Sequence, residues 1–375
     1  MGQLLQPRSV KLATRTVHVV RDQHGATEPI APSISLASVH AFPDLDVLGD
    51  VSLGKRHEWF YRRYGHPNGR LLEEAVAGLE GADDALACAS GMTAALVLFW
   101  ATLKPGDHLV AAQDVYGGTY SFLKKHAPRL GIEVTFVPSE AAAFERALRT
   151  STKALFFETV TNPLMNRPDG RRICAIGRRA GARVYVDNTF ATPVLAQPIS
   201  WGADVVYHSG TKFLSGHGDA ISGVVAGPKD LIASMGSLAI SLGAVISPMD
   251  AWLTLRGLRT LDVRVRKATA NAKKLAAFLK RSKVRLNYPG DGPMLSFELK
   301  DIAAAKRFVA RAKLVKLVPS LGDVATTMSH PARSSHAYLS REEREAVGVR
   351  DGLIRVSVGI EDVADVIEDF KNALR

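Results

Sequence analysis

The chain has 375 residues, of which 46% are hydrophobic and 23% are charged, and this is the composition of an ordinary globular protein. Its length is sufficient for a large α/β domain and a second, smaller one. Two cysteines, Cys88 and Cys174, are too few for a disulfide framework, and the longest apolar stretch, residues 94–103, is too short to cross a bilayer. Because the first residues also lack the apolar core of a signal peptide, we expect a soluble, cytoplasmic protein without a membrane partner.

The formal net charge is +11, from 48 basic and 37 acidic side chains. A positive surface is compatible with a nucleic-acid partner. The basic residues are, however, scattered over helical stretches such as residues 256–267, and no compact basic run is interleaved with aromatic residues. We therefore expect no nucleic-acid partner and attribute the charge to attraction of anionic substrates or phosphate groups. We assign no metal ligands.

Turn-forming residues are frequent in the first fifty residues, and we expect residues 1–50 to form an extended arm. From about residue 72, helical stretches alternate with short apolar runs. Helices are expected at residues 72–79, from residue 92 and at 122–130, and strands at 85–88, 108–112, 134–137, 154–157, 184–186 and 205–207. This alternation is typical of a mostly parallel central sheet with helices on both faces. We assign residues 51–245 to this domain.

The last third of the chain has a different pattern. A long helical stretch is expected from residue 248 to residue 279, followed by strands at 295–299 and 353–358. These elements indicate a smaller C-terminal α/β domain, residues 246–375. The predicted fold class is therefore α/β, with two unequal domains after the arm.

A glycine lies between the first strand and the next helix, in Ser-Gly-Met-Thr, residues 90–93. Gly91 permits a close backbone approach, and the start of a helix offers free N–H groups and a positive dipole end to a phosphate. An ordinary N-cap by Ser90 would have the same sequence. Since ligands of open α/β sheets bind beyond the carboxyl ends of the strands, the position favours a ligand.

Four further strand ends carry side chains of chemical interest. Tyr116 could stack on an aromatic ring, Asn162 could reach a ring substituent, and Asp187 could keep a pyridine nitrogen protonated. Lys212, behind a cluster of hydroxyl residues, could form an imine with an aldehyde. Each has an alternative role, as a loop tyrosine, a turn opener, a helix cap or a solvated surface lysine. Taken together in chain order, they are the groups that pyridoxal phosphate (PLP) requires.

The chain resembles the Cys/Met-metabolism family of PLP-dependent enzymes, which contains cystathionine γ-synthase, cystathionine β- and γ-lyases, methionine γ-lyase and homoserine sulfhydrylases. The most specific similarity is the pair of segments DNTFATP, residues 187–193, and HSGTKF, residues 208–213. Less specific similarities are at residues 116–120 and 247–261. The resemblance implies the PLP-dependent transferase type I fold and a homo-oligomer, expected to be a tetramer built as a dimer of dimers.

The resemblance also implies a role for each matching residue. Lys212 would hold PLP covalently and then act as general base, Asp187 would pair with the pyridinium nitrogen, and Tyr116 would stack on the ring and assist proton movement. The residues implied to bind the phosphate are Gly91, Met92, Ser209 and Thr211, together with Tyr61 and Arg63 of a neighbouring subunit. The residues implied to bind the substrate carboxylate are Arg355 and its helpers Asn162 and Ser320.

These similarities predict a sulfur amino-acid enzyme that cleaves a C–S bond by β- or γ-elimination in transsulfuration. One alternative is a γ-replacement synthase, and another is a non-catalytic binding or regulatory protein on a PLP scaffold. Departures from the family bear on this choice. Methionine γ-lyases have a cysteine where this chain has Gly118, and many γ-acting members have a glutamate where it has Ala325. His66 and Gly210 replace the usual asparagine and alanine.

Overall fold

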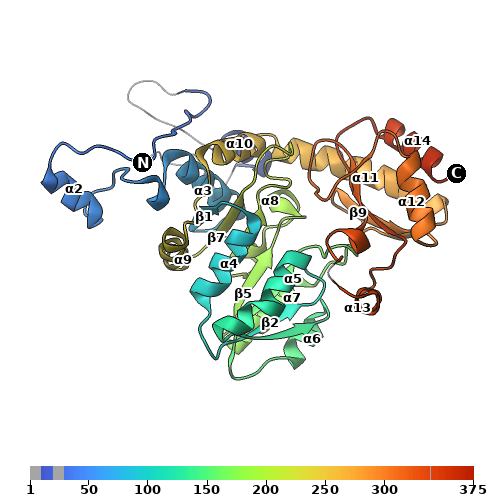
Figure 1. Ribbon diagram of the computed structural model, residues 1–375, viewed down its shortest axis with the longest axis horizontal. Coiled ribbons are helices and arrows are strands. Elements are labelled where there is room, and N and C mark those ends of the chain that lie inside the picture. Colours follow the sequence, from blue (N-terminus) through green and yellow to red (C-terminus); the bar gives the residue numbers. More distant parts are fainter. Residues whose placement is uncertain (1–9, 20–28, 338) are drawn as a thin grey trace.

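A seven-stranded sheet forms the centre of the larger part of the molecule (Figure 1). The computed structural model describes residues 10–19, 29–337 and 339–375. The strand order is β1-β7-β6-β5-β4-β2-β3. The strands are β1 (Asp84–Cys88), β2 (His108–Ala112), β3 (Glu133–Val137), β4 (Thr152–Glu158), β5 (Arg183–Asp187), β6 (Val205–Ser209) and β7 (Gly223–Gly227).

Strand β7 is antiparallel to both of its neighbours, β1 and β6, and the other neighbouring pairs of this sheet are parallel. The sequence pattern does not predict this strand, because its apolar residues form a short run between two glycines. The six other strands are where the apolar runs predict them. Their residues are mostly buried, as expected for strands covered by helices on both faces.

Helices cover both faces of the sheet, so the predicted architecture is confirmed. One apolar core is shared by the sheet with α4 (Gly91–Thr102), α5 (Gly117–Lys125), α6 (Ala141–Arg146), α7 (Gly170–Ala180) and α9 (Lys229–Leu242). A second core joins the sheet to α3 (Pro67–Glu80), α10 (Pro248–Leu258) and α11 (Leu261–Arg281). The short α8 (Thr192–Leu195) follows β5. The predicted helix at 122–130 begins earlier, at Gly117, and is followed by a 3-10 turn at Ala127–Leu130.

A five-stranded sheet forms the smaller C-terminal part, in the order β10-β11-β12-β9-β8. Its elements are β8 (Arg285–Asn287), β9 (Met294–Glu298), α12 (Ile302–Arg311), β10 (Lys316–Leu317), β11 (Thr327–Ser329), α13 (Arg341–Ala346), β12 (Leu353–Ser357) and α14 (Val363–Ala373). Helices α11, α12 and α14 share an apolar core with this sheet. The long α11 lies along both parts of the molecule and connects them (Figure 1).

The helical stretch predicted from residue 248 to residue 279 is two helices, which corrects that prediction. Helix α10 ends at Leu258 and α11 begins at Leu261. Buried Arg264 stabilises the break, because its guanidinium donates to the carbonyl of Gly257 (2.7 Å) at the end of α10 and to that of Phe213 (2.8 Å). An arginine that caps another helix across a turn leaves no mark in hydrophobic periodicity.

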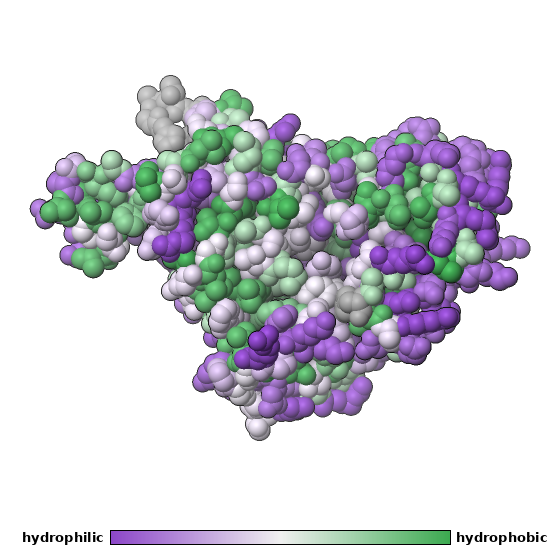
Figure 2. Space-filling model, in the orientation of Figure 1, coloured by the Kyte–Doolittle hydropathy of each residue, from purple (hydrophilic) through white to green (hydrophobic). Residues whose placement is uncertain are grey.

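The N-terminal segment contains two short helices where an extended arm is expected. Helix α1 (Leu12–Val17) and helix α2 (Leu45–Ser52) are its regular elements in the described residues. No residue of α2 is buried, and α2 projects from the body of the molecule (Figure 1). Figure 2 shows apolar residues on this projection, where Leu45 and Leu53 are 83% and 71% exposed. Among the described residues, no helix has the length and apolar character needed to cross a bilayer.

Candidate active site

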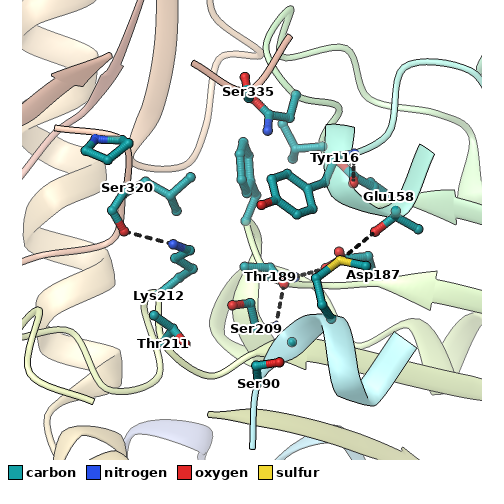
Figure 3. Close-up of a pocket in the computed structure, with 18 of the residues that line it drawn as sticks. Ser90, Tyr116, Glu158, Asp187, Thr189, Ser209, Thr211, Lys212, Ser320 and Ser335 are labelled. Atoms are coloured by element: carbon teal, nitrogen blue, oxygen red, sulfur yellow. Dashed lines mark hydrogen bonds between the residues drawn. The ribbon is translucent and has the colours of Figure 1, made fainter. Parts of the chain in front are cut away.

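A cavity of about 450 Å³ opens at the carboxyl ends of the central strands, where the C-terminal part meets the sheet. All the predicted site residues except Tyr61 and Arg63 line it (Figure 3). The position agrees with the general rule for open α/β sheets. Sequence segments that are far apart, from Ser90 to Arg355, therefore meet in one site.

One end of the cavity is a narrow cradle between α4 and the end of β6. Ser90 caps α4, since its Oγ accepts from the N–H of Thr93 at 3.1 Å. A Cβ atom built on Gly91 would lie 2.7 Å from the Cβ of Ser209, so only glycine allows this approach. The free N–H groups at the start of α4 and the neighbouring hydroxyls form a site suited to a phosphate.

The loop after β6 is fixed to β7 through Thr211. Its hydroxyl accepts from the N–H of Ser222 at 3.0 Å and donates to the carbonyl of Ser222 at 3.2 Å. The N–H of Ser209 donates to Oγ1 of Thr189 at 2.9 Å. These bonds hold the segment that contains Lys212 in a defined place beside the cradle.

Asp187, the last residue of β5, is buried beneath the cavity. Burial raises the pKa of its carboxyl group, while hydrogen bonds from Thr189 and Tyr207 act in the opposite direction. The N–H of Thr189 donates to Oδ1 of Asp187 at 2.9 Å. A buried acid with these donors is suited to a cationic ring nitrogen.

The side chain of Lys212 points into the cavity from the other side (Figure 3). Its Nζ donates to Oγ of Ser320 at 2.8 Å. Burial, and next the positive charge of Arg355, lower the pKa of Lys212 to about 8. An amine with this pKa is available as a nucleophile and a base near neutral pH.

Arg355 on β12 is buried at the edge of the cavity. Its Nη1 donates to Oδ1 of Asn162 at 2.9 Å, and its Nη2 donates to the carbonyl of Ser320 at 3.1 Å. Burial lowers the pKa of Arg355 to about 10. Both hydrogen-bond acceptors are neutral, so the guanidinium charge is available to a carboxylate ligand.

Tyr116 precedes α5, and its ring lies over the cavity (Figure 3). Its N–H donates to Oε1 of Glu158 at 2.5 Å. A Cβ on Gly118 would lie 2.6 Å from Cε1 of Tyr116 and 3.0 Å from Sδ of Met92. The position of the tyrosine ring therefore depends on glycine at position 118.

Several lining residues have no role in the sequence prediction. Glu158, Thr189 and Tyr207 face the cavity from the central sheet, while Ser334 and Ser335 come from a C-terminal loop. The pattern of strand ends contained a signal for Glu158, the last residue of β4. It contained none for the two serines, since only the packing of the C-terminal part brings them to the site.

Tyr61 and Arg63 lie away from this cavity in the single chain. Nη1 of Arg63 donates to the carbonyl of Ile240 at 3.3 Å, and its guanidinium lies over the rings of Tyr61 and Tyr64. Tyr61 is 42% exposed. Their predicted role, in the site of a neighbouring subunit, remains a prediction.

Fold and pocket together define an enzyme of the class that binds an aldehyde cofactor carrying a phosphate. The model of the family described as "Cys/Met metabolism PLP-dependent enzyme" matches residues 13–375. The chain is 42% identical over 345 residues to a cystathionine beta-lyase of Lactococcus lactis subsp. cremoris, covering 86% of this chain and 90% of the relative. It is 37% identical over 385 residues to an L-methionine gamma-lyase of Pseudomonas putida, covering 97% of each.

Solved structures agree with this assignment. A cystathionine gamma synthase from Xanthomonas oryzae pv. oryzae, in complex with cystathionine, has a TM-score of 0.92 and 34% identity over 98% of each chain. A putative O-acetylhomoserine (thiol)-lyase from Campylobacter jejuni, with a pyridoxyl-lysine phosphate, has a TM-score of 0.91 and 28% identity, covering 97% of this chain and 100% of that one. This chain belongs to the Cys/Met-metabolism family of PLP-dependent enzymes. The predicted family, fold class and cofactor are confirmed.

Proposed function

We propose that this enzyme cleaves a C–S bond of a sulfur amino acid by β- or γ-elimination. The observation that carries the proposal is the presence of Lys212, Asp187 and Arg355 around one cavity, in a chain 42% identical to a cystathionine beta-lyase. The same observation sets aside the non-catalytic alternative, because the family consists of enzymes and this chain has the full set of reactive side chains.

The residues present fit PLP. The cradle that a Cβ at Gly91 would fill suits the phosphate, with Met92, Ser209 and Thr211 beside it. Asp187 suits the ring nitrogen, and Lys212 suits the aldehyde carbon. When bound, PLP withdraws the negative charge that develops at Cα of an amino acid.

Two residues act on the substrate in this proposal. Arg355 binds the α-carboxylate through its guanidinium, which Asn162 and Ser320 orient. Lys212 removes the Cα proton through Nζ, which its lowered pKa of about 8 permits. Tyr116, which lines the same cavity, gives a proton to the departing sulfur in this proposal.

A γ-replacement synthase is the second candidate. It is favoured by the TM-score of 0.92 to the cystathionine gamma synthase and by 39% identity over 334 residues to an O-succinylhomoserine sulfhydrylase of Pseudomonas aeruginosa. Its substrate would be an activated homoserine, with a thiol as the second reactant.

Incubation with cystathionine alone tests the first candidate. A lyase releases a thiol and a keto acid without a second substrate, and Lys212→Ala abolishes both products and the visible absorption of the bound cofactor. A synthase instead consumes an activated homoserine only when cysteine or sulfide is added. Turnover of neither substrate set by the yellow protein would contradict both candidates.

We also propose a cytoplasmic homotetramer, with the arm up to residue 50, the PLP-binding domain at residues 51–245 and the C-terminal domain at residues 246–375 as its parts. The exposed apolar side chains of the N-terminal segment support an interface there, since large exposed apolar surface marks an interaction site. In the assembly, Tyr61 and Arg63 would reach the phosphate of a neighbouring subunit.

A further inference from the structure

Glu158 is a buried acid in the active-site cavity that has no role so far. It is the last residue of β4 and is 4% exposed. The register of the parallel strands pairs it with Asp187, the last residue of β5, so the two acids lie side by side at the sheet edge. Both line the cavity. Two neighbouring buried carboxyl groups cannot both ionise without a large cost in free energy.

The two acids differ in the hydrogen bonds that stabilise an anion. Asp187 receives hydrogen bonds from Thr189 and from the hydroxyl of Tyr207. Glu158 accepts from the main-chain N–H of Tyr116. Because the charged form is better solvated at Asp187, the shared proton belongs on Glu158.

On balance, the surroundings of Glu158 raise its pKa and so favour its neutral form. Burial and next the charge of Asp187 raise the pKa of Glu158 well above its ordinary value, and Asp114 adds to the increase. The N–H of Tyr116 and the charge of Arg355 oppose it. Tyr207 on β6 also faces Glu158.

We propose that Glu158 is a positioning residue that remains a neutral carboxylic acid. Its Oε1 anchors the main chain of Tyr116 at the start of α5, and thereby the ring that covers the cavity (Figure 3). The neutrality of Glu158 leaves Asp187 as the anion that would pair with the ring nitrogen of PLP. It also keeps the guanidinium of Arg355 free, since an ionised Glu158 would compete with the substrate carboxylate for that charge.

The inference rests on the proposed roles of Asp187 and Arg355. The variants test the role of Glu158 and the proposed cofactor site separately. Glu158→Gln keeps the acceptor for Tyr116 but cannot ionise, whereas Glu158→Ala removes both properties. Asp187→Asn tests the proposed cofactor site itself. Glu133→Gln, whose side chain is 62% exposed on β3, is the matched control for a change of glutamate to glutamine.

The first measurement is made on the protein without and with PLP. Infrared spectra of protein labelled with ¹³C-glutamate are expected to contain, at neutral pH, the C=O band of a protonated carboxyl group that is lost in Glu158→Gln. Glu73, whose pKa burial raises to about 7, contributes equally to both spectra and cancels in their difference. The band persists in Glu133→Gln. A wild-type protein without this band would overturn the proposal.

The second measurement is PLP affinity, obtained by titrating the apoprotein and following its fluorescence. Glu158→Ala is expected to raise the dissociation constant about tenfold, through the lost anchor of Tyr116, and Glu158→Gln by less than about threefold. Equal loss in the two variants would mean that the negative charge is needed, and would contradict a neutral Glu158. An Asp187→Asn protein that binds PLP as tightly as wild type would instead remove the proposed cofactor site on which the inference depends.

The third measurement is the pH dependence of KM with the holoenzyme. Ionisation of wild-type Glu158 as the pH rises weakens carboxylate binding at Arg355, so KM is expected to rise about tenfold more than in Glu158→Gln. The titrations of Lys212 and of the substrate amine are common to both proteins and cancel in this comparison, which is made below the pKa of about 10 of Arg355. Identical KM profiles would overturn the role assigned to the neutral acid.

Discussion

At the scale of single residues, the charge of Arg355 affects the protonation of Lys212. Burial and this charge lower the pKa of Lys212. Replacing Arg355 with leucine therefore raises that pKa, and the acid limb of the pH profile of kcat is expected to move to higher pH. Loss of charge-assisted hydrogen bonds worth about 1.5–3 kcal/mol also raises KM by roughly one to two orders of magnitude. Arg355→Lys retains the charge and is expected to keep the acid limb in place; coincident limbs in all three proteins would refute the coupling.

A second prediction at this scale concerns Gly118. A methyl group there would lie 2.6 Å from the ring of Tyr116, so the ring must move away from its place over the cavity. Overpacking of this kind costs about 1–3 kcal/mol, and Gly118→Ala is expected to weaken PLP binding at least about fivefold. Gly236→Ala in α9 meets nothing within 4 Å and is the matched control. Equal PLP dissociation constants for the two variants would show that Tyr116 tolerates the added group.

Individual site residues differ in how far the sequence predicts them. Lys212 and Asp187 follow apolar strands directly, so the carboxyl-end rule for parallel sheets brings them to one edge. Glu158 obeys the same rule, but its importance depends on the β4–β5 register, which sequence does not contain. Ser334 and Ser335 reach the cavity only through the packing of the C-terminal sheet.

At the scale of elements, α3 begins at a histidine cap. Nδ1 of His66 accepts from the N–H of Gly69 at 3.1 Å, and Nε2 donates to the carbonyl of Ile246 at 3.0 Å. This arrangement requires the neutral ring. Burial first, and also the charge of Arg62, lower the pKa of His66, while the bond to Ile246 opposes them.

A pH-dependent stability follows from this cap. The pKa of His66 is lower in the folded protein than in the unfolded chain. The stabilisation that the cap gives to the folded state is therefore present above about pH 6.5 and is lost as the pH falls towards the folded-state pKa. His66→Asn supplies an acceptor that does not titrate. We expect the Tm of the wild type to fall more between about pH 8 and pH 5 than that of His66→Asn. Parallel Tm curves would mean that the pKa of His66 does not differ between the folded and the unfolded protein.

Among the elements, the break between α10 and α11 and strand β7 are predicted poorly from the sequence. Apolar periodicity runs without interruption through α10 and α11, and the separation depends on buried Arg264 binding the carbonyls of Gly257 and Phe213. Strand β7 is a five-residue run between glycines, and it becomes a strand because β1 and β6 both pair with it. Tertiary contacts rather than local propensity decide both cases.

At the scale of the whole molecule, the site is divided between distant parts of the chain and, in our proposal, between subunits. The sheet contributes Asp187 and Lys212, and the C-terminal part contributes Arg355 and Ser320. Arg63 is distant in sequence from Asp187 and Lys212, and its guanidinium donates to the carbonyl of Ile240 on α9, at the surface. A guanidinium held at the surface by one main-chain carbonyl is suited to a ligand from another chain.

Mixing two inactive variants tests this division of the site. Arg63→Ala is expected to weaken PLP retention so far that turnover is lost without added PLP, and Lys212→Ala is expected to abolish turnover. If Arg63 acts in the partner's site, a hybrid dimer has one site with both defects and one with neither, so equal amounts of the two proteins recover about a quarter of wild-type activity after subunit exchange. If Arg63 acts within its own chain, every hybrid site keeps one defect and no activity returns. Exchange is verified with differently tagged chains, so that absence of recovery in confirmed hybrids would count against a shared site.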